Sequence, residues 1–211
     1  MTQYIALVQV KGGAGKSTIA ANICGYFVSK GVSVLSVDAD MPQATLSGWA
    51  ALTPEHENHH HVAVSTTEEL IQELEQADGK YDIVIIDSPP RIAEMLKAIL
   101  FIGDLVLVPL EATAPDIWST QDLLPIIHEA AKEKELNLRL VFNEYTPSKR
   151  NEEIRAEAIA TLQLPQMESY LTRYVGYSEV MGTGKHVLKH NHQKSKAQFK
   201  QFIAEVETLL K

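Results

Sequence analysis

A glycine-rich run near the N-terminus reads Lys11-Gly12-Gly13-Ala14-Gly15-Lys16-Ser17-Thr18. An apolar segment, residues 4–10, precedes it, and a segment with helical spacing of its apolar residues, 17–29, follows it. Glycines let a turn wrap closely around an anion, and the free N–H groups and dipole of the next helix attract negative charge. The run is a shortened form of the phosphate-loop pattern. We therefore expect a strand, a phosphate-binding turn and a helix, in that order.

The side chains of this run suit the phosphates of a nucleotide. Lys16 is expected to neutralise the β- and γ-phosphates, and the hydroxyl of Ser17 is expected to ligate Mg²⁺. A glycine-rich turn without a ligand is the alternative, but the strand before the run and the helix after it match the context that the pattern requires. We expect the phosphates to lie against Gly12, Gly13, Ala14, Gly15, Lys16, Ser17 and Thr18.

Short apolar runs alternate with helical patterns along the rest of the chain. Parallel strands need crossover connections, which are usually helices, and strands that are apolar throughout indicate burial on both faces of a sheet. We predict a single-domain α/β fold of the P-loop NTPase type, with a mostly parallel twisted sheet and helices on both faces. The expected strands are residues 4–10, 33–37, 83–86, 105–110 and 138–142, and the expected helices are residues 17–29, 67–76, 117–132, 152–162 and 194–210.

Acidic residues stand at the ends of two expected strands. Asp87 follows residues 83–86, and Asp38 and Asp40 follow residues 33–37. Open α/β sheets bind ligands at the carboxyl ends of their strands, so these carboxylates are expected beside the phosphate-binding turn. Asp87 would hold Mg²⁺ through a water molecule. Of the other two, one can support the metal's water shell and one can orient or deprotonate the attacking water, although an isolated Asp-x-Asp is usually a turn.

The length and composition fit one domain over residues 1–211. A chain of 211 residues buries a sizeable core without disulfides, and its single cysteine, Cys24, excludes a disulfide within one chain and fits a reducing compartment. The first ten residues do not resemble a secretion signal, and no segment approaches the length of about 18 apolar residues that spans a bilayer. We expect a cytoplasmic protein that does not enter the membrane.

The charge is distributed unevenly. The net charge is −8, but residues 1–148 carry 9 basic and 20 acidic residues, whereas residues 149–211 carry 10 basic and 7 acidic ones. The segment 181–200 has five lysines, three histidines and no acid. Clustered positive charge binds nucleic-acid phosphates without sequence preference, and a solvated surface is the alternative. The candidate DNA-binding residues are Arg150, Arg155, Arg173, Lys185, Lys189, Lys194, Lys196 and Lys200.

These motifs together resemble the ParA/MinD family of deviant Walker A ATPases. The resemblance covers essentially the whole chain, and the lysine before the paired glycines, Lys11, is its most specific mark. It implies an ATP-dependent sandwich dimer in which Lys11 reaches the partner's nucleotide while Lys16 holds the phosphates of its own subunit. The matching segments are residues 11–17, the strand ending Asp38-Ala39-Asp40, the strand ending Asp87-Ser88-Pro89, and Val106-Leu107-Val108-Pro109.

The resemblance also implies roles for other residues. Asp40 would position the hydrolytic water, Asp38 would support the metal shell, and Asp87 would be the Walker B acid. Asn143 matches a position that commonly recognises adenine in the family. One departure concerns Asp40: the family has Asp-Pro-Gln at this point, whereas Met41 intervenes here before Pro42. We expect the extra residue to shift Asp40 and to slow a turnover that is already slow in the family.

The size resembles the small plasmid-type ParA proteins. The resemblance implies slow ATP hydrolysis, DNA binding without sequence preference, association with the nucleoid in the ATP-bound state, and a ParB-like partner that stimulates hydrolysis during plasmid partition. The same mechanism could position a carboxysome or a chemoreceptor cluster. A metabolic ligase of the dethiobiotin synthetase type is a further alternative, but it would not need Lys11 as an intersubunit lysine. A MinD-like membrane role would require a terminal anchor, whereas residues 199–211 are expected to form the last helix of the fold.

Weaker features have simpler interpretations. His56 and the run 59–61 are expected to lie in a solvated loop rather than to bind a metal. Cys24 is expected in the core, and residues 182–185, which imitate a second phosphate loop, are expected to form a flexible turn because no apolar strand precedes them. Trp49 and Trp118 are expected to be packing or interface residues. Asp116 is expected near a helix N-cap and close to the dimer face of the family.

Overall fold

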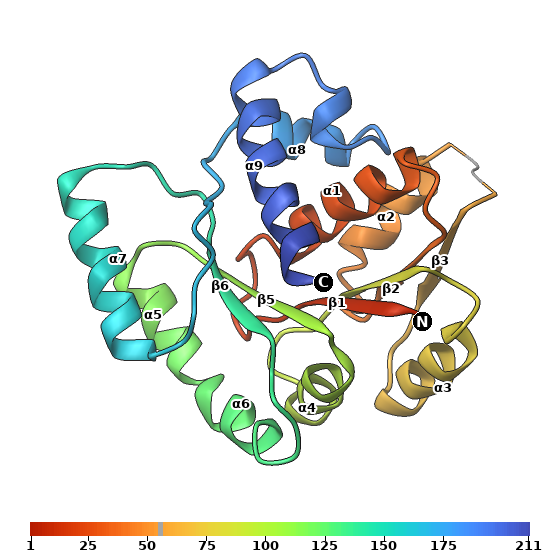
Figure 1. Cartoon of the computed structure of the whole chain (residues 1–211), viewed down its shortest axis with the longest axis horizontal. Coiled ribbons are helices and arrows are strands. Elements are labelled where there is room, and N and C mark those ends of the chain that lie inside the picture. Colours follow the sequence, from red (N-terminus) through yellow and green to blue (C-terminus); the bar gives the residue numbers. More distant parts are fainter. Residues whose placement is uncertain (55–56) are drawn as a thin grey trace.

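The centre of the molecule is a parallel β-sheet (Figure 1). A computed structural model describes residues 1–54 and 57–211. Within these residues the sheet has six strands in the order β3-β2-β4-β1-β5-β6, and every neighbouring pair is parallel. The predicted α/β class is therefore confirmed. The strands are β1 (Gln3–Leu7), β2 (Val34–Asp38), β3 (His59–Ala63), β4 (Ile83–Asp87), β5 (Leu105–Leu110) and β6 (Leu138–Phe142).

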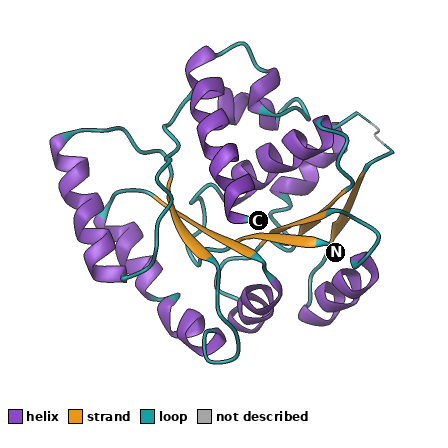
Figure 2. Cartoon of the chain, viewed as in Figure 1, coloured by secondary structure: helices purple, strands orange, loops and turns teal. Residues whose placement is uncertain are grey.

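Helices cover both faces of the sheet, as Figure 2 shows by colour. One face carries α1 (Lys16–Ser29), α2 (Thr45–Leu52), α8 (Val175–Met181), the 3₁₀ turn η1 (Val187–Lys189) and α9 (Gln193–Leu209). The other face carries α3 (Thr67–Ala77), α4 (Ala93–Ile102), α5 (Ala114–Gln121), α6 (Leu124–Ala130) and α7 (Lys149–Leu162).

Alternate residues of the central strands belong to two separate cores. In β1, Ile5 and Leu7 pack with the α1 layer, whereas Ala6 packs with the α3–α7 layer. Successive side chains of a strand point to opposite faces, so a strand covered on both sides must be apolar at every position. This explains why residues 83–86 are apolar throughout. The predicted last helix is confirmed as α9, whose Phe199 and Phe202 are fully buried in the α1 core.

One predicted helix is two helices. The apolar spacing predicted a single helix over 117–132, but the chain forms α5 and α6 with a turn between them. Pro125 lies in the first turn of α6 and has no N–H to continue the hydrogen bonding of α5, so the helix is interrupted before it. Thr113 caps α5 by accepting a hydrogen bond from the N–H of Asp116.

The prediction of a solvated loop at residues 59–61 is wrong. These three histidines begin β3, an edge strand that pairs with β2, with His59 opposite Val34 and His61 opposite Ser36. The strand was not recognised because its polar residues lack the apolar run of a central strand: His59 and His61 occupy one face, where they contact Ser36, and Val62 is the apolar residue that packs on the other face. His56 lies outside the described residues. The helices α2, α4 and α8 were also not predicted.

Candidate functional site

The glycine-rich run forms the turn between β1 and α1. Gly13 and Gly15 have φ angles of +81° and +93°, which side chains rarely adopt. Gly15 is also the N-cap of α1, and a Cβ there would overlap the amide nitrogen of Asn143. That Nδ2 donates a hydrogen bond to the carbonyl of Ala14 at 3.0 Å. Asn143, which follows β6, therefore fixes the shape of the turn.

The N-terminus of α1 offers free N–H groups. The first intrahelical hydrogen bond that closes onto the cap runs from Ile19 N to Gly15 O at 3.0 Å, and no side chain caps the helix. The N–H groups of the first turn have no helical acceptor, and the helix dipole adds to their positive potential. A phosphate group fits this position, because the glycine turn leaves it open to close approach.

Lys16 is a buried cation at the start of α1. Lys16 is only 4% exposed. Burial lowers the pKa of Lys16, and the nearby carboxylates of Asp87 and Asp40 act against that shift. The sequence placed these three residues at different points of the chain, and the fold brings their charges within electrostatic reach of one another.

Asp87 is a buried carboxylate without a protein partner. It ends β4 opposite Asp38 of β2, and neither of its oxygens accepts a hydrogen bond from the residues that the structure describes. Burial raises the pKa of Asp87 to about 7; Asp38 and Asp40 push it the same way, and the Ser17 hydroxyl and Lys16 push it down. Buried polar atoms are nearly always paired, so an unpaired buried carboxylate beside a hydroxyl suits a bound Mg²⁺.

Asp38, its neighbour on β2, is fully paired. It accepts hydrogen bonds from the N–H of Asp40 at 3.1 Å and from the N–H and hydroxyl of Ser47, both at 2.8 Å. Ser47 lies in the first turn of α2, so the Asp38 carboxylate fastens that helix to the sheet. Of the two opposed aspartates, Asp38 is thus a structural anchor, and Asp87 keeps both oxygens available.

Asp40 stays beside these groups despite the extra residue Met41. Burial raises its pKa, Asp38 adds to the rise, and Lys16 opposes it, so the carboxyl group lies in the field of both. Met41 is 39% exposed. The chain then turns back, with Ala44 N donating to Asp40 O at 2.9 Å and Ala44 at a φ of +51°. The chain therefore reverses direction within the loop between β2 and α2.

Lys11 makes an ion pair within its own chain. Its Nζ donates to Oδ2 of Asp116 at 2.6 Å, and the Asp116 side chain is 2% exposed. The same Oδ2 accepts a hydrogen bond from the Thr113 hydroxyl at 2.6 Å. Sequence reasoning placed Asp116 near a helix N-cap and missed this contact, which joins residues 105 positions apart. Trp118, two residues later on α5, is 64% exposed.

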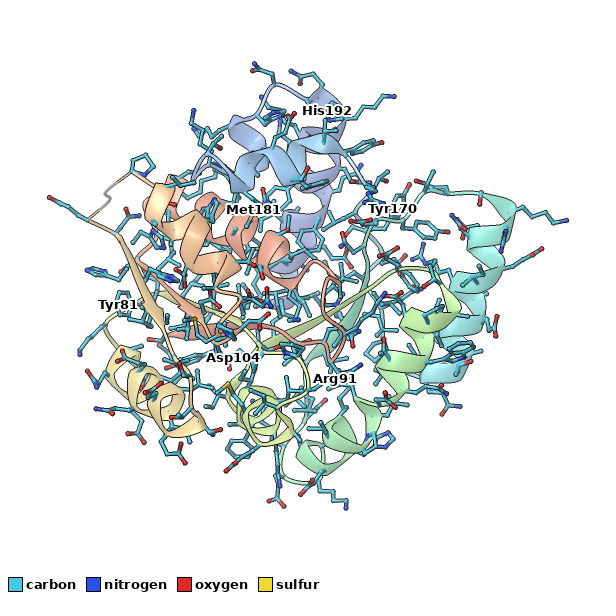
Figure 3. All side chains as sticks on the ribbon, turned by 180° about the vertical axis from the view of Figure 1, so that it is seen from behind. Tyr81, Arg91, Asp104, Tyr170, Met181 and His192 are labelled. Carbon is cyan, nitrogen blue, oxygen red and sulfur yellow. The ribbon has the colours of Figure 1, made fainter. Side chains whose placement is uncertain are left out.

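The predicted basic surface lies on η1, α9 and the segment before them. Lys185, Lys189, Lys194 and Lys200 are exposed, and Lys196 is half-buried. Figure 3 marks this region with Met181 and His192. Arg150 stands at the start of α7, which lies beside α5 and away from α8 and α9 in Figure 1.

Several positive or titratable groups of the C-terminal third are engaged internally. Arg155 donates twice to Oε1 of Gln166 at 3.1 Å and stacks over the ring of Phe142. Arg173 pairs with Glu144 at 3.2 Å, and His190 pairs with Glu179 at 2.8 Å. His186 is buried. Fewer basic side chains of this region are therefore available to a ligand than the sequence suggested, and most of those available are lysines.

A hydrogen-bonded chain of side chains links β3 to the site. The Ser36 hydroxyl lies 3.0 Å from Nε2 of His59 and 2.9 Å from Nδ1 of His61, and Nε2 of His61 lies 2.9 Å from the Ser47 hydroxyl that contacts Asp38. Cys24 is fully buried, as predicted, with its sulfur 3.4 Å from Nε2 of His59. Within residues 1–54 and 57–211 no group of three potential ligands is arranged to hold a metal ion.

The segment 182–185 is a turn fastened to α2. Gly184 has a φ of +62°, and a Cβ there would overlap the backbone of Leu52. The buried indole of Trp49 donates to the carbonyl of Lys185 at 2.9 Å. The turn is therefore packed against its neighbours, and Trp49 is a packing residue.

Comparison with known proteins gives a consistent result. The CobQ/CobB/MinD/ParA nucleotide binding domain matches residues 5–187. Maintenance of carboxysome distribution protein A of Halothiobacillus neapolitanus is 28% identical over 183 residues, covering 85% of this chain and 84% of that protein. Protein ParA of Rhizobium radiobacter is 29% identical over 151 residues, covering 71% of this chain and 68% of that protein.

The same fold occurs in a solved structure. The septum site-determining protein MinD of Pyrococcus horikoshii, complexed with Mg-ADP, superposes with a TM-score of 0.80 at 20% identity, covering 99% of this chain and 97% of that one. Of the helices that the structure describes, none has the length and apolar character needed to cross a bilayer.

Proposed function

The chain belongs to the CobQ/CobB/MinD/ParA nucleotide-binding family as a ParA/MinD-like ATPase, and from this premise we propose that it forms an ATP-dependent dimer, binds DNA without sequence preference and moves a cargo with a partner protein. The observation that carries the proposal is the buried, unpartnered carboxylate of Asp87 beside Lys16 and Ser17. A purely structural site would have paired these oxygens, as it pairs those of Asp38.

The residues present fit a nucleotide with Mg²⁺. Ser17 and Asp87 would hold the metal, and Asp38 would support its water shell. The bound metal supplies positive charge that polarises the phosphate oxygens. The turn over residues 12–15 and the N–H groups of α1 receive the phosphates, and Asn143 is assigned to the adenine side of the turn.

The chain's own groups then carry the hydrolysis. Lys16 stabilises the negative charge that builds up on the γ-phosphate and the leaving oxygen. Asp40 is assigned to orient the attacking water and accept its proton, because its carboxyl group lies in the electrostatic field of Lys16, which faces the phosphates. Lys11 acts on the partner subunit's nucleotide. To do so it must leave Asp116, so the ion pair at 2.6 Å belongs to the monomer.

The lysine surface is assigned to DNA. Lys185, Lys189, Lys194 and Lys200 are exposed, and a dimer doubles their number. Phosphate contacts by lysines release counterions, so affinity should fall steeply with salt. We place the protein in the cytoplasm, on the nucleoid when ATP is bound. Arg150 and Arg173 are lesser contributors, because one lies on a separate helix and the other pairs with Glu144.

The cargo is a plasmid in the first form of the proposal, delivered by a ParB-like protein that binds a centromere. A protein body such as a carboxysome is the second form. One observation favours the second: the relative named for carboxysome distribution covers 85% of this chain, whereas the relative named ParA covers 71%. Removing the gene separates the two forms, since loss of plasmids supports the first and misplaced protein bodies with stable plasmids support the second.

A variant of Lys11 tests the mechanism itself. Lys11→Ala should still bind ATP through the intact turn, but it should lose dimerisation with ATP and its ATP hydrolysis. Equilibrium dialysis with labelled ATP, light scattering and phosphate release measure the three properties. Lys97→Ala, which alters a lysine on α4 away from the site, is the matched control. Unchanged dimerisation and hydrolysis in Lys11→Ala would instead fit a metabolic ligase and overturn the proposal.

A further inference from the structure

A groove opens between α3 and α4, on the sheet face opposite α8 and α9. Its volume is about 850 Å³. Apolar side chains of both helices line it, together with residues at the start of β1 and just before β5. The apolar lining residues of the two helices are Ile71, Leu74, Ala98, Phe101 and Ile102.

Two large apolar residues of the lining are exposed. Phe101 is 52% exposed and Ile71 is 39% exposed, and both belong to this groove. Contiguous exposed apolar surface on a helix pair costs free energy in water and commonly marks a site of association. The exposed pair therefore indicates that something apolar covers the groove in the working protein.

The rim of the groove is acidic. Five carboxylates line it, whereas the lysine among its lining residues, Lys97, pairs with Glu129 outside the groove. Burial raises the pKa of Tyr4, and the carboxylates of Asp78 and Asp104 raise it further, as expected in a negative potential. The acidic lining residues are Glu75, Asp78, Glu94, Asp104 and Glu133.

Lys134, which follows the lining residue Glu133, is also engaged. Lys134 donates to the carbonyls of Phe101 and Gly103 at 2.8 and 2.9 Å, where it caps the C-terminus of α4. Its charge serves the end of the helix rather than the rim.

The groove is remote from the nucleotide and from the lysine surface. Thr2 and Tyr4 place it at the amino edge of the sheet, whereas the nucleotide site lies at the carboxyl edge with Asp38 and Asp87. In Figure 3, Asp104 of the groove lies well away from His192 at the start of α9. Neither nucleotide nor DNA on the lysine surface would cover the groove.

We propose that this groove docks an amphipathic helix of a partner protein, with apolar side chains on one face of that helix and lysines or arginines along its borders. The apolar face fills the channel between Ile71 and Phe101, and the basic borders meet the acidic rim. That the partner is the cargo adaptor rests on the proposed function; the docking of a basic amphipathic helix does not. Charge excludes other occupants: DNA and anionic lipid would face carboxylates, and a second copy of the groove would oppose acid to acid.

A designed peptide tests the docking. The probe is a fluorescein-labelled 18-residue amphipathic helix of leucine and lysine, and its twin carries glutamate in place of lysine. Fluorescence anisotropy at about 0.1 M salt should show binding of the lysine peptide and none of the glutamate twin. Amide chemical shifts in ¹⁵N-labelled protein should move in α3 and α4.

Two pairs of variants locate the binding. Phe101→Ser, which removes the apolar contact, and Glu75→Lys with Glu94→Lys, which reverses the rim, should each weaken binding at least about tenfold. The matched controls are Val175→Ser, at an apolar residue 59% exposed on α8, and Glu153→Lys with Glu157→Lys, at exposed positions of α7. Circular dichroism checks that each variant folds, and the rim pair lies at the surface, where substitutions are tolerated.

The outcomes decide the proposal. Equal weakening by the α7 pair would show attraction to overall negative charge and overturn it. Self-association of the wild type that Phe101→Ser abolishes would assign the groove to a second copy and overturn it as well. ATP hydrolysis and DNA binding should be unchanged in the groove variants. A wild type that binds the peptide but neither hydrolyses ATP nor dimerises would refute the proposed function and leave the docking groove standing.

Discussion

The carboxyl edge of the sheet, where the nucleotide site lies, and the lysine surface of η1 and α9 differ in how their charges are surrounded. At the edge, Lys16, Asp38 and Asp87 are buried. The charges of Asp38 and Lys16 both act on the pKa of Asp87. On the surface, Lys189 and Lys194 project into water. Burial makes each charge at the edge depend on a few neighbours, whereas water screens the surface lysines from one another. Function is therefore concentrated in single residues at the edge and divided among many on the surface.

The difference sets how each region responds to substitution. Removing one charged group at the nucleotide edge removes its whole contact with the phosphates or the metal, so a single substitution should cause a large loss of activity. Removing one exposed lysine leaves a surface that water already solvates, so only its share of the binding is lost. A large effect on the surface or a small effect at the edge would contradict this comparison.

The largest expected effect is at Lys16. Lys16→Ala should reduce ATP hydrolysis by about a thousandfold or more, because the charge that faces the phosphates is lost. Phosphate release in single turnover measures it. Lys30→Ala, at the C-terminal end of α1, is the control and should keep nearly full activity. A loss below tenfold in Lys16→Ala would show that the edge does not concentrate function in this residue.

Replacing Asp87 should lower the activity and raise the stability of the metal-free protein. Asp87→Asn should lose magnesium-dependent hydrolysis by about a hundredfold or more, and without metal or nucleotide it should be more stable than the wild type, by about 1 kcal/mol. The gain arises because an amide is cheaper to bury than a carboxylate without partners. Urea denaturation in EDTA measures the stability. Destabilisation of the metal-free protein would indicate that Asp87 has partners in the folded chain.

The next effect concerns Lys11. Its side chain is 35% exposed, which is between the buried charges of the nucleotide edge and the solvated lysines of the surface. If the ion pair with Asp116 opposes dimerisation, Asp116→Asn should strengthen the ATP-dependent dimer about tenfold, because the competing charge is gone and the shape is kept. Sedimentation velocity across a range of protein concentrations measures it. Asp122→Asn, at an exposed acid just after α5, is the control. A weaker dimer in Asp116→Asn would show that Asp116 supports the dimer instead.

The strand ends and the glycine turn could be predicted because their chemistry is local. The turn at 12–17 needs residues of fixed type at fixed spacing, and Asp38 and Asp87 each follow an apolar strand directly, so the parallel sheet had to bring them to one edge. The fold class followed from the same alternation of strands and helices.

The remaining features depend on contacts between distant segments. Nothing local to Lys11 indicates that it contacts Asp116, and nothing local to His190 indicates that it contacts Glu179. The edge strand β3 has no apolar run, because His59 and His61 occupy one of its faces, where they contact Ser36 through hydrogen bonds. Such pairs are settled by tertiary packing, and a charge count along the sequence therefore overestimated the positive surface.

His186 is a buried titratable group within the basic segment 181–200. Burial, with Lys189 adding to the effect, lowers the pKa of His186 to about 4. The unfolded chain binds a proton near pH 6.5, so stability is complete above pH 6.5 and falls as the pH drops towards 4. From pH 7 to pH 4.5 the free energy of unfolding should therefore fall by up to about 2 kcal/mol because of His186.

His186→Met should remove that part of the pH dependence. Urea denaturation of both proteins at pH 7 and pH 4.5 gives the difference, and His128→Gln, at an exposed histidine of α6, is the control and should keep the wild-type pH dependence. If the pH dependence of His186→Met equals that of the wild type, His186 is solvated and belongs with the surface groups.

The smallest expected effects are those of the single lysines. Lys189→Gln and Lys194→Gln should each weaken binding to random duplex DNA about threefold at 0.1 M salt and lower the slope of log affinity against log salt by about 1, and together they should act additively. Lys80→Gln, just after α3 on the opposite sheet face, should leave the slope unchanged. Fluorescence anisotropy with ATP from 50 to 200 mM salt measures both quantities. Because screened charges act independently, additivity is the signature of the surface regime; one lysine that abolished binding alone would show that the surface holds a concentrated site like the one at the nucleotide edge.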